Sequence, residues 1–178
     1  MKPPKTIMRF DQDKAVEIIK FIARHAPNPD IYWVGKILYF ADKLHLQKYG
    51  RLICGDDYVA MRYGPVPSGT YKLLREARDY NDILDWHPAP GEFEIEGKNK
   101  VVALKDANMD FFSDSDIECL KESIRKYGKL TFGKLKSTSH DAAYDAADEN
   151  DFMDVEKIVR TLPNAKAVLE HIRDCSHV

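Results

Sequence analysis

The sequence predicts a single compact helical domain with a small antiparallel β-sheet, that is, a mainly α fold of the α+β class. Two observations support this prediction. Apolar residues recur at helical spacing in several long segments, and short alternating segments are bounded by glycine and proline. The length of 178 residues suits one domain covering 1–178, and 44% hydrophobic residues can build a core without disulfides or metal.

Three helices are predicted in the first half of the chain, where apolar residues at helical spacing lie between capping and breaking residues. They are expected at about 11–25, 31–50 and 69–80. Asp30 is expected to cap the second helix and Gly50 to end it in a left-handed conformation. The apolar surface of this second helix is wide, which predicts a central place in the core. Ser68 is expected to cap the third helix.

A short strand and a rigid bend are predicted between the second and third helices. The segment from Tyr58 to Tyr63 alternates and is rich in β-favouring side chains. The residues that follow, 64–67, read Gly-Pro-Val-Pro and force an extended bend, because each proline fixes its own φ and restricts its predecessor. The bend is interpreted as a connector into the third helix or, alternatively, as a rigid surface for a partner.

The second half of the chain is predicted to hold a hairpin and several helices. Two alternating segments, 93–96 and 101–104, flank a glycine-containing turn. A helix capped by Ser113 or Asp114 is expected to end near Gly128. Shorter helices are expected at 130–136 and 164–173, with a short segment of unassigned type near 155–159.

Charge and cysteine content narrow the class of protein. A formal net charge of −2 argues against a protein whose whole surface binds nucleic acid. Cys54, Cys119 and Cys175 are far apart and outside any CxxC pair, which predicts reduced thiols and a cytoplasmic location. No segment approaches the ~20 apolar residues of a membrane span, and the N-terminus lacks the apolar stretch of a signal peptide. We therefore expect a soluble intracellular protein without a membrane partner.

No motif in the sequence requires catalysis, a metal or a cofactor. Ser139-His140-Asp141 has the residue types of a nucleophilic triad, but adjacent side chains cannot form the relay among themselves. Asp42 and His45 can meet on one helix face, yet a metal needs more ligands than this pair. The phosphate-binding glycine loops of common nucleotide sites are absent. We expect no enzyme activity, no metal and no cofactor.

A basic surface is the alternative functional feature. Packing of the second helix beside the third would bring six cations together, and three tyrosines would lie among them to stack on bases. These residues are Lys36, Lys43, Arg62, Lys72, Arg75 and Arg78, with Tyr39, Tyr63 and Tyr71. Acidic residues between them favour a solvated face instead. The acidic run 141–156 is likewise interpreted as solvated surface, with a basic partner as the alternative.

An ordered set of residues resembles the SocA-like antitoxin family, which carries a Panacea domain and is often phage-associated. The pattern consists of KxLYFAD, a histidine, YG, GDxY and GPVP, formed here by Lys36–Asp42, His45, Tyr49-Gly50, Gly55–Tyr58 and Gly64–Pro67. The diagnostic stretch covers about residues 34–78, and Leu130, Leu135, Ser139 and His140 extend it. The segment 140–178 is less similar, because Ala142-Ala143-Tyr144 stand where the family often has Pro and Trp.

The resemblance implies the antitoxin of a bacterial or prophage toxin–antitoxin system, which neutralises a cognate toxin by direct protein–protein binding. The toxin would be encoded by a neighbouring gene, and a protease or host factor stays open as a further partner. The alternative is a nucleic-acid-binding regulator that uses the basic face of the second and third helices. The residues expected to contact a partner are Tyr39, Asp42, His45, Arg62, Tyr63, Gly64, Pro65, Val66 and Pro67. Asp42 and His45 have a second interpretation, as buried partners that fix the loop.

Overall fold

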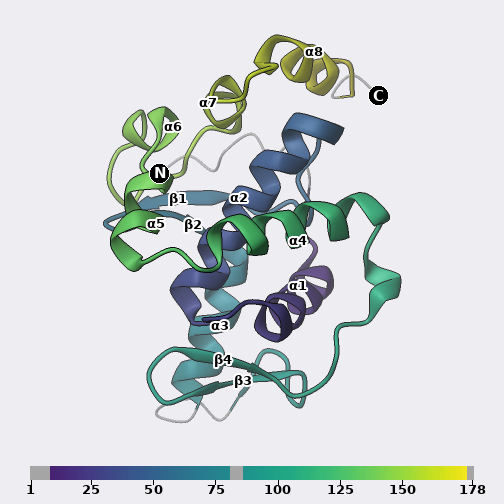
Figure 1. Ribbon diagram of the computed structural model, residues 1–178, viewed down its shortest axis with the longest axis vertical. Coiled ribbons are helices and arrows are strands. Elements are labelled where there is room, and N and C mark those ends of the chain that lie inside the picture. Colours follow the sequence, from purple (N-terminus) through teal and green to yellow (C-terminus); the bar gives the residue numbers. More distant parts are fainter. Residues whose placement is uncertain (1–8, 81–85, 176–178) are drawn as a thin grey trace.

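The computed structural model of the chain describes residues 9–80 and 86–175 (Figure 1). Within these ranges the chain forms a mainly helical α+β fold, as predicted. Its strands form two separate two-stranded antiparallel sheets, each a hairpin, rather than one common sheet. None of the described helices is long and apolar enough to cross a bilayer.

The first three helices lie close to their predicted positions. They are α1 (Gln12–His25), α2 (Ile31–Tyr49) and α3 (Ser68–Tyr80). The Asp30 side chain caps α2 by accepting the Trp33 N–H at 2.9 Å. Gly50 ends α2 with a φ of 70°, the left-handed conformation expected for it.

The remaining elements follow the predicted order, with additions. The second hairpin consists of β3 (Phe93–Glu96) and β4 (Lys100–Ala103), and a short 3-10 helix η1 (Met109–Phe111) leads to α4 (Asp114–Tyr127). The helices α5 (Phe132–Ser139), α6 (Ala142–Asp145), α7 (Val155–Arg160) and α8 (Ala165–Cys175) complete the described chain. The short helix α6 was not predicted. Its N-cap, Asp141, lies in the acidic run that was interpreted as solvated surface or, alternatively, as a contact for a basic partner.

Helix α2 runs through the centre of the molecule and joins two apolar clusters. One cluster packs α1, α3, α4 and the β3–β4 hairpin against α2 through residues such as Ile37 and Leu38. The other uses Tyr39, Phe40 and Leu46 to contact strand β1 (Tyr58–Met61), α5, α7 and α8. Figure 1 accordingly shows α7 and α8 at one end of the molecule and the β3–β4 hairpin at the other. The central place predicted from the wide apolar surface of α2 is confirmed.

The predicted bend after Tyr63 is the second strand of a hairpin, so this part of the prediction was wrong. Strand β1 (Tyr58–Met61) pairs antiparallel with β2 (Gly64–Pro67), and Met61 stands opposite Gly64. Arg62 and Tyr63 form the two-residue turn. The other edge of β1 pairs with the segment 150–153, where the Met153 N–H donates to the Tyr58 carbonyl at 2.7 Å. The hairpin is therefore fixed on the body of the protein.

The alternating prolines suit this strand because of its register. Pro65 and Pro67 stand opposite Ala60 and Tyr58, whose backbone groups bond outward to the segment 150–153. Since hydrogen bonds alternate along an antiparallel pair, the ladder needs no N–H from either proline. The Pro65 carbonyl consequently points away from β1.

The N-terminus of α3 is capped by a distant residue rather than by Ser68. The Asp56 carboxylate accepts the N–H groups of Gly69 and Thr70 at 2.7 and 2.8 Å, and the Thr70 hydroxyl at 2.7 Å. Burial raises the pKa of Asp56 even though these hydrogen bonds act in the opposite direction. Asp56 thus ties the loop before β1 to the start of α3.

Candidate functional site

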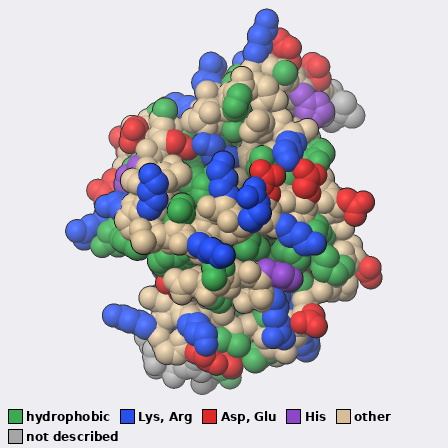
Figure 2. Space-filling view, in the orientation of Figure 1, with side chains coloured by type: hydrophobic (Ala, Val, Ile, Leu, Met, Phe, Trp, Pro, Cys, Tyr) green, Lys and Arg blue, Asp and Glu red, His purple; other side chains and the backbone are tan. Residues whose placement is uncertain are grey.

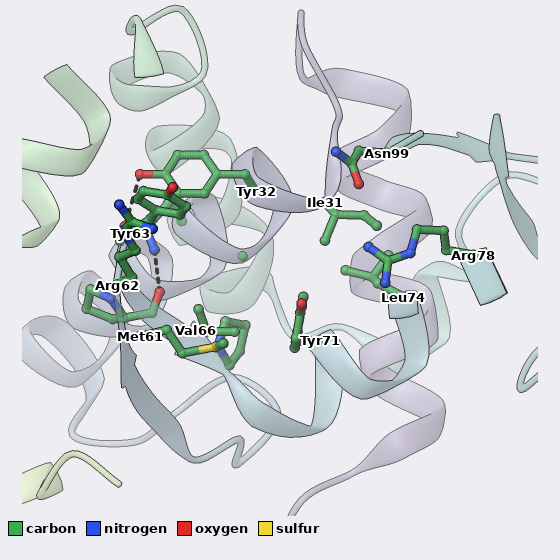
Figure 3. A pocket seen from close by; sticks show the side chains of 14 residues that line it. Ile31, Tyr32, Met61, Arg62, Tyr63, Val66, Tyr71, Leu74, Arg78 and Asn99 are labelled. Carbon is green, nitrogen blue, oxygen red and sulfur yellow. Dashed lines mark hydrogen bonds between the residues drawn. The ribbon is translucent and has the colours of Figure 1, made fainter. Parts of the chain in front are cut away.

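A groove lies between α2, the β1–β2 hairpin and α3 (Figure 3). Its volume is about 360 Å³. Ile31, Met61, Val66 and Leu74 supply apolar lining. Figure 3 shows the hairpin turn with Arg62 at one end of the groove, and α3 with Arg78 at the opposite end.

An aromatic rim borders the groove at the hairpin turn. It consists of Tyr32, Tyr63 and Phe132; Tyr63 is 44% exposed and Phe132 is 42% exposed. The Phe132 ring centroid lies 4.7 Å from that of Tyr32 and 5.5 Å from that of Tyr63. The Tyr32 hydroxyl donates to the Tyr63 carbonyl at 3.1 Å. Tyr63 is thus exposed, as predicted, but Phe132 was missed because only the fold brings α5 beside the turn.

Gly64 allows the hairpin to pack closely on the end of α5. Its φ is 104°, which L side chains rarely adopt. A Cβ at this position would lie 2.5 Å from the Ser139 hydroxyl and 3.2 Å from the His140 ring. The neighbouring Pro65 and Pro67 are buried in the groove floor, while Val66 is half-buried. The proline strand therefore offers one accessible surface, which faces the groove.

The groove also contains a buried lysine that has no carboxylate partner among the described residues. Lys36 is 1% exposed, and its Nζ donates to the Pro65 carbonyl at 2.6 Å. The same Nζ lies 4.7 Å from the centroid of the Tyr32 ring. Burial lowers the pKa of Lys36 from 10.5 to about 7. In the part of the chain that the structure describes, this amine contacts a neutral carbonyl and the face of a ring, and it forms no ion pair.

Three of the residues predicted to contact a partner lie in the interior instead. Tyr39, Asp42 and His45 are each at most 1% exposed, and none lines the groove. Asp42 accepts the Ile53 N–H at 2.7 Å and the Tyr58 hydroxyl at 2.6 Å. Direct partner contact by these three side chains is therefore corrected to a structural role. The wide apolar surface of the helix predicted its central place, but it did not identify which of these polar side chains would be covered.

Asp42 and His45 nevertheless hold the chain around the hairpin, in line with their second interpretation. Desolvation raises the pKa of Asp42 to about 6 despite its two hydrogen bonds. His45 bonds the Arg51 carbonyl through Nδ1 at 2.9 Å, and its Nε2 lies 3.2 Å from the Asp116 carboxylate. Burial alone would raise the pKa of Asp116, but hydrogen bonds from His45 and Lys14 outweigh it and hold this pKa well below its usual range. This network belongs to the core.

The triad-like residues each make contacts of their own, and no hydrogen bond joins Ser139 to His140 among the described residues. The Ser139 hydroxyl donates to the Lys136 carbonyl at 2.9 Å. Asp141 caps α6 and accepts the Tyr39 hydroxyl and the Lys43 ammonium at 2.9 and 2.6 Å. Nε2 of His140 is buried and has no hydrogen-bond partner within residues 9–80 and 86–175. No serine–histidine relay forms here.

The basic face predicted for the second and third helices does not form. Lys36 lies inside, Lys43 pairs with Asp141, and Arg62 and Arg78 stand at opposite ends of the groove. A basic stretch at the end of α4 and in α5 was missed: Lys121, Arg125, Lys126, Lys129, Lys134 and Lys136, with Glu122 as its one acidic residue. Figure 2 shows Lys and Arg side chains across the middle of the face, where these helices run. A count of charges along the sequence would have found it.

A comparison with known protein families finds a match that covers most of the residues that line the groove. The family model described as antitoxin SocA-like, Panacea domain, matches residues 34–144. This segment is more than half of the chain and runs from α2 through both hairpins to α6. It supports an antitoxin-type role. No curated protein and no solved structure matches the chain.

Proposed function

We propose that this chain, which belongs to the antitoxin SocA-like family with a Panacea domain, neutralises a cognate toxin by direct protein–protein binding. The toxin is encoded by a neighbouring gene of the same bacterial or prophage system. The protein acts without catalysis, as a binding module. The observation that carries this proposal is the open groove that the family's proline motif builds with α2 and α3.

The groove has the properties of a preformed docking site. Its hairpin is paired to the segment 150–153 on one side and packed on α5 on the other. A rigid surface of this kind loses little conformational entropy on binding. Arg62 and Tyr63 stand exposed at its turn, and Arg and Tyr are favoured anchors at protein interfaces.

Two further features support the proposal. Among the described residues, the Ser139 hydroxyl donates to the Lys136 carbonyl and no hydrogen bond joins it to His140, so no nucleophilic relay is formed. Cys54 and Cys119 are buried free thiols, which suits a reducing compartment such as the cytoplasm. The side chain of Cys175 lies outside the described residues.

Co-expression with the neighbouring gene product tests the proposal. The neighbour should be lethal alone, and the wild-type chain should relieve lethality and capture it in a pull-down. The double variant Arg62→Ala/Tyr63→Ala should lose both effects while keeping its helical circular dichroism. A matched control, Lys72→Ala/Arg75→Ala, changes exposed α3 residues outside the groove and should behave as wild type. A neighbour that is harmless, or that the wild type neither binds nor neutralises, refutes the proposal.

The basic stretch 121–136 favours a second candidate, nucleic-acid binding through α4 and α5. Phosphate contacts would make the affinity fall steeply with salt. Fluorescence anisotropy with a labelled 20-base-pair duplex at 50 and 200 mM salt measures this. The charge reversal Lys126→Glu should weaken such binding, and salt-independent or absent binding removes this candidate.

A further inference from the structure

We propose that the groove recognises an apolar segment of the partner that carries a carboxylate, and that Lys36 receives this carboxylate. The occupant is a peptide segment in which an acidic residue, or a chain-terminal carboxylate, is flanked by apolar side chains. The inference rests on the proposed function in one respect, since it takes the toxin as the source of this segment. The chemistry itself is argued from the groove.

The first argument is charge complementarity. The groove lining contains Lys36, Arg62 and Arg78 and no acidic residue. Arg62 makes no ion pair within the described residues, and its described contact is with the face of the Tyr63 ring. Arg78 pairs with its sequence neighbour Asp79 at 3.0 Å on the surface. Lys36 and Arg62 therefore bring positive charge to the groove that no ion pair among the described residues neutralises.

The second argument compares Lys36 with the other buried lysine of the core. Lys20 is 2% exposed and pairs with Glu17 and Glu92 at 2.9 and 2.5 Å. Lys36 is equally buried, yet its described acceptor is the Pro65 carbonyl. A buried ammonium is strongly disfavoured unless it is paired and hydrogen-bonded. A carboxylate that enters the groove would supply the counter-charge that the fold leaves out.

The third argument concerns the walls. Ile31, Met61, Val66 and Leu74 line the groove, and Pro65 and Pro67 form its floor. A cavity of about 360 Å³ accommodates a few side chains but no folded element. A free phosphate or a nucleic-acid backbone would leave these apolar walls unused. An acidic residue between apolar neighbours uses both the charge and the walls.

The titratable and charged groups around Lys36 define how pH acts. They are Tyr32 on α2, Arg62 and Tyr63 on the hairpin, Tyr71 and Arg78 on α3, and Lys136 and His140 on α5. Burial, followed by the charges of Lys136 and Lys36, lowers the pKa of His140, which favours its neutral form. Burial raises the pKa of Tyr32 to about 12. Burial lowers the pKa of Lys36 to about 7, so we expect this amine to make binding depend on pH.

Affinity for a carboxylate should fall as pH rises through this range. The bound carboxylate favours the ammonium form of Lys36, so binding takes up a proton once the free amine has lost it. With a pKa of about 7 in the free protein, the dissociation constant should rise roughly tenfold between pH 6.5 and 8. The Lys36→Met variant should lack this dependence.

A small probe tests the chemistry without the toxin. N-acetyl-phenylalanine is titrated into the full-length protein and followed by amide chemical shifts in NMR spectra. We expect shifts in α2 and β2 and a dissociation constant on the order of a millimolar. The neutral N-acetyl-phenylalaninamide should bind at least tenfold more weakly. Equal binding of acid and amide, shifts remote from the groove, or displacement of the probe by equimolar inorganic phosphate overturns the inference.

The toxin completes the test and separates the two proposals. Lys36→Met should weaken toxin binding at least thirtyfold, whereas Lys72→Met, an exposed control on α3, should not. Unaltered toxin binding by Lys36→Met overturns the carboxylate inference but leaves the antitoxin proposal standing. Absence of toxin binding by the wild type refutes the antitoxin proposal, while the probe still decides the chemistry. If Lys36→Met fails to fold, Lys36→Gln and the acid–amide comparison on the wild type give the answer.

Discussion

Two buried polar regions on the same helix differ in how they are satisfied. Toward the C-terminal half of α2, Asp42 accepts two hydrogen bonds and His45 lies between a carbonyl and the Asp116 carboxylate. One turn and a half earlier, Lys36 has a neutral carbonyl and the face of Tyr32. The comparison indicates that buried polar groups whose hydrogen-bond partners come from the protein itself maintain the fold. A buried charge that lacks a counter-charge is instead available to a partner. The predictions below test this division.

The largest effect on stability is expected for Asp42, which receives two hydrogen bonds from the protein itself. Asp42→Ala leaves the Ile53 N–H and the Tyr58 hydroxyl buried without their acceptor, which should lower the free energy of unfolding by about 3 kcal/mol. Urea denaturation followed by circular dichroism measures it. Glu170→Ala, at an exposed position on α8, is the control and should change little. A loss below about 1 kcal/mol for Asp42→Ala would contradict the structural role of this carboxylate.

The close contact between the hairpin and α5 should give the next largest effect. Gly64→Ala forces a Cβ toward the Ser139 hydroxyl at a φ of 104°, and about 2 kcal/mol of stability should be lost. Gly133→Ala is the matched control, because a Cβ at Gly133 in α5 meets nothing within 4 Å. That control should be neutral or slightly stabilising. Thermal melts of both variants provide the measurement, and equal melting temperatures would argue against close packing at Gly64.

Replacing Lys36, which has no counter-charge among the described residues, should change the free energy of unfolding in the opposite direction. Lys36→Met removes a buried amine and should raise the free energy of unfolding at pH 6.5 by about 1–2 kcal/mol. The pKa of Lys36 is about 7 in the folded protein, below its ordinary 10.5, so the unfolded chain binds more protons between these values. Wild-type stability attributable to Lys36 therefore rises with pH across this window.

The gain from Lys36→Met should accordingly shrink between pH 6.5 and 9.5. Urea denaturation of both proteins at the two pH values tests this, with Lys72→Met as the exposed control. If Lys36→Met is destabilised at both pH values, Lys36 belongs to the groups that maintain the fold. The proposed difference between Lys36 and the pair Asp42 and His45 would then be wrong.

The smallest effect on stability is expected at the rim. Arg62 and Tyr63 are exposed at the turn of the hairpin, so Arg62→Ala/Tyr63→Ala should alter the free energy of unfolding by about 0.5 kcal/mol or less. Its effect on toxin capture should nevertheless be as large as that of Lys36→Met. A cooperative loss of structure in the double variant would show instead that the turn is needed for folding.

The parts of the fold that depend on neighbouring residues in sequence could be predicted. Asp30 and Gly50 bracket α2 as expected, because a cap needs only the adjacent backbone. The start of α3 was predicted less well, because its capping carboxylate comes from Asp56, twelve residues before the helix. The second strand was missed because proline is read as a breaker, while its compatibility depends on the register with β1.

The predicted site residues likewise fall into two groups, those that line the groove and those that lie in the core. Arg62, Tyr63 and the proline strand line the groove, and their role in binding stays a prediction. Tyr39, Asp42 and His45 share the same motif but face the core. Tyr39 packs in the cluster with α5, α7 and α8, Asp42 bonds Ile53 and Tyr58, and His45 lies against Arg51 and Asp116 of α4. Helical spacing reveals which residues share a face, but it does not reveal what covers that face.

Both edges of the β1–β2 hairpin are closed to a further strand. The segment 150–153 occupies the outer edge of β1, and the outward positions of β2 are Pro65 and Pro67, which have no N–H to donate. A visiting polypeptide therefore cannot extend this sheet through a backbone ladder, a mode of capture that accepts almost any sequence. Discrimination must come from side chains, so replacing a few rim residues could redirect the protein to a different target while its scaffold stays unchanged.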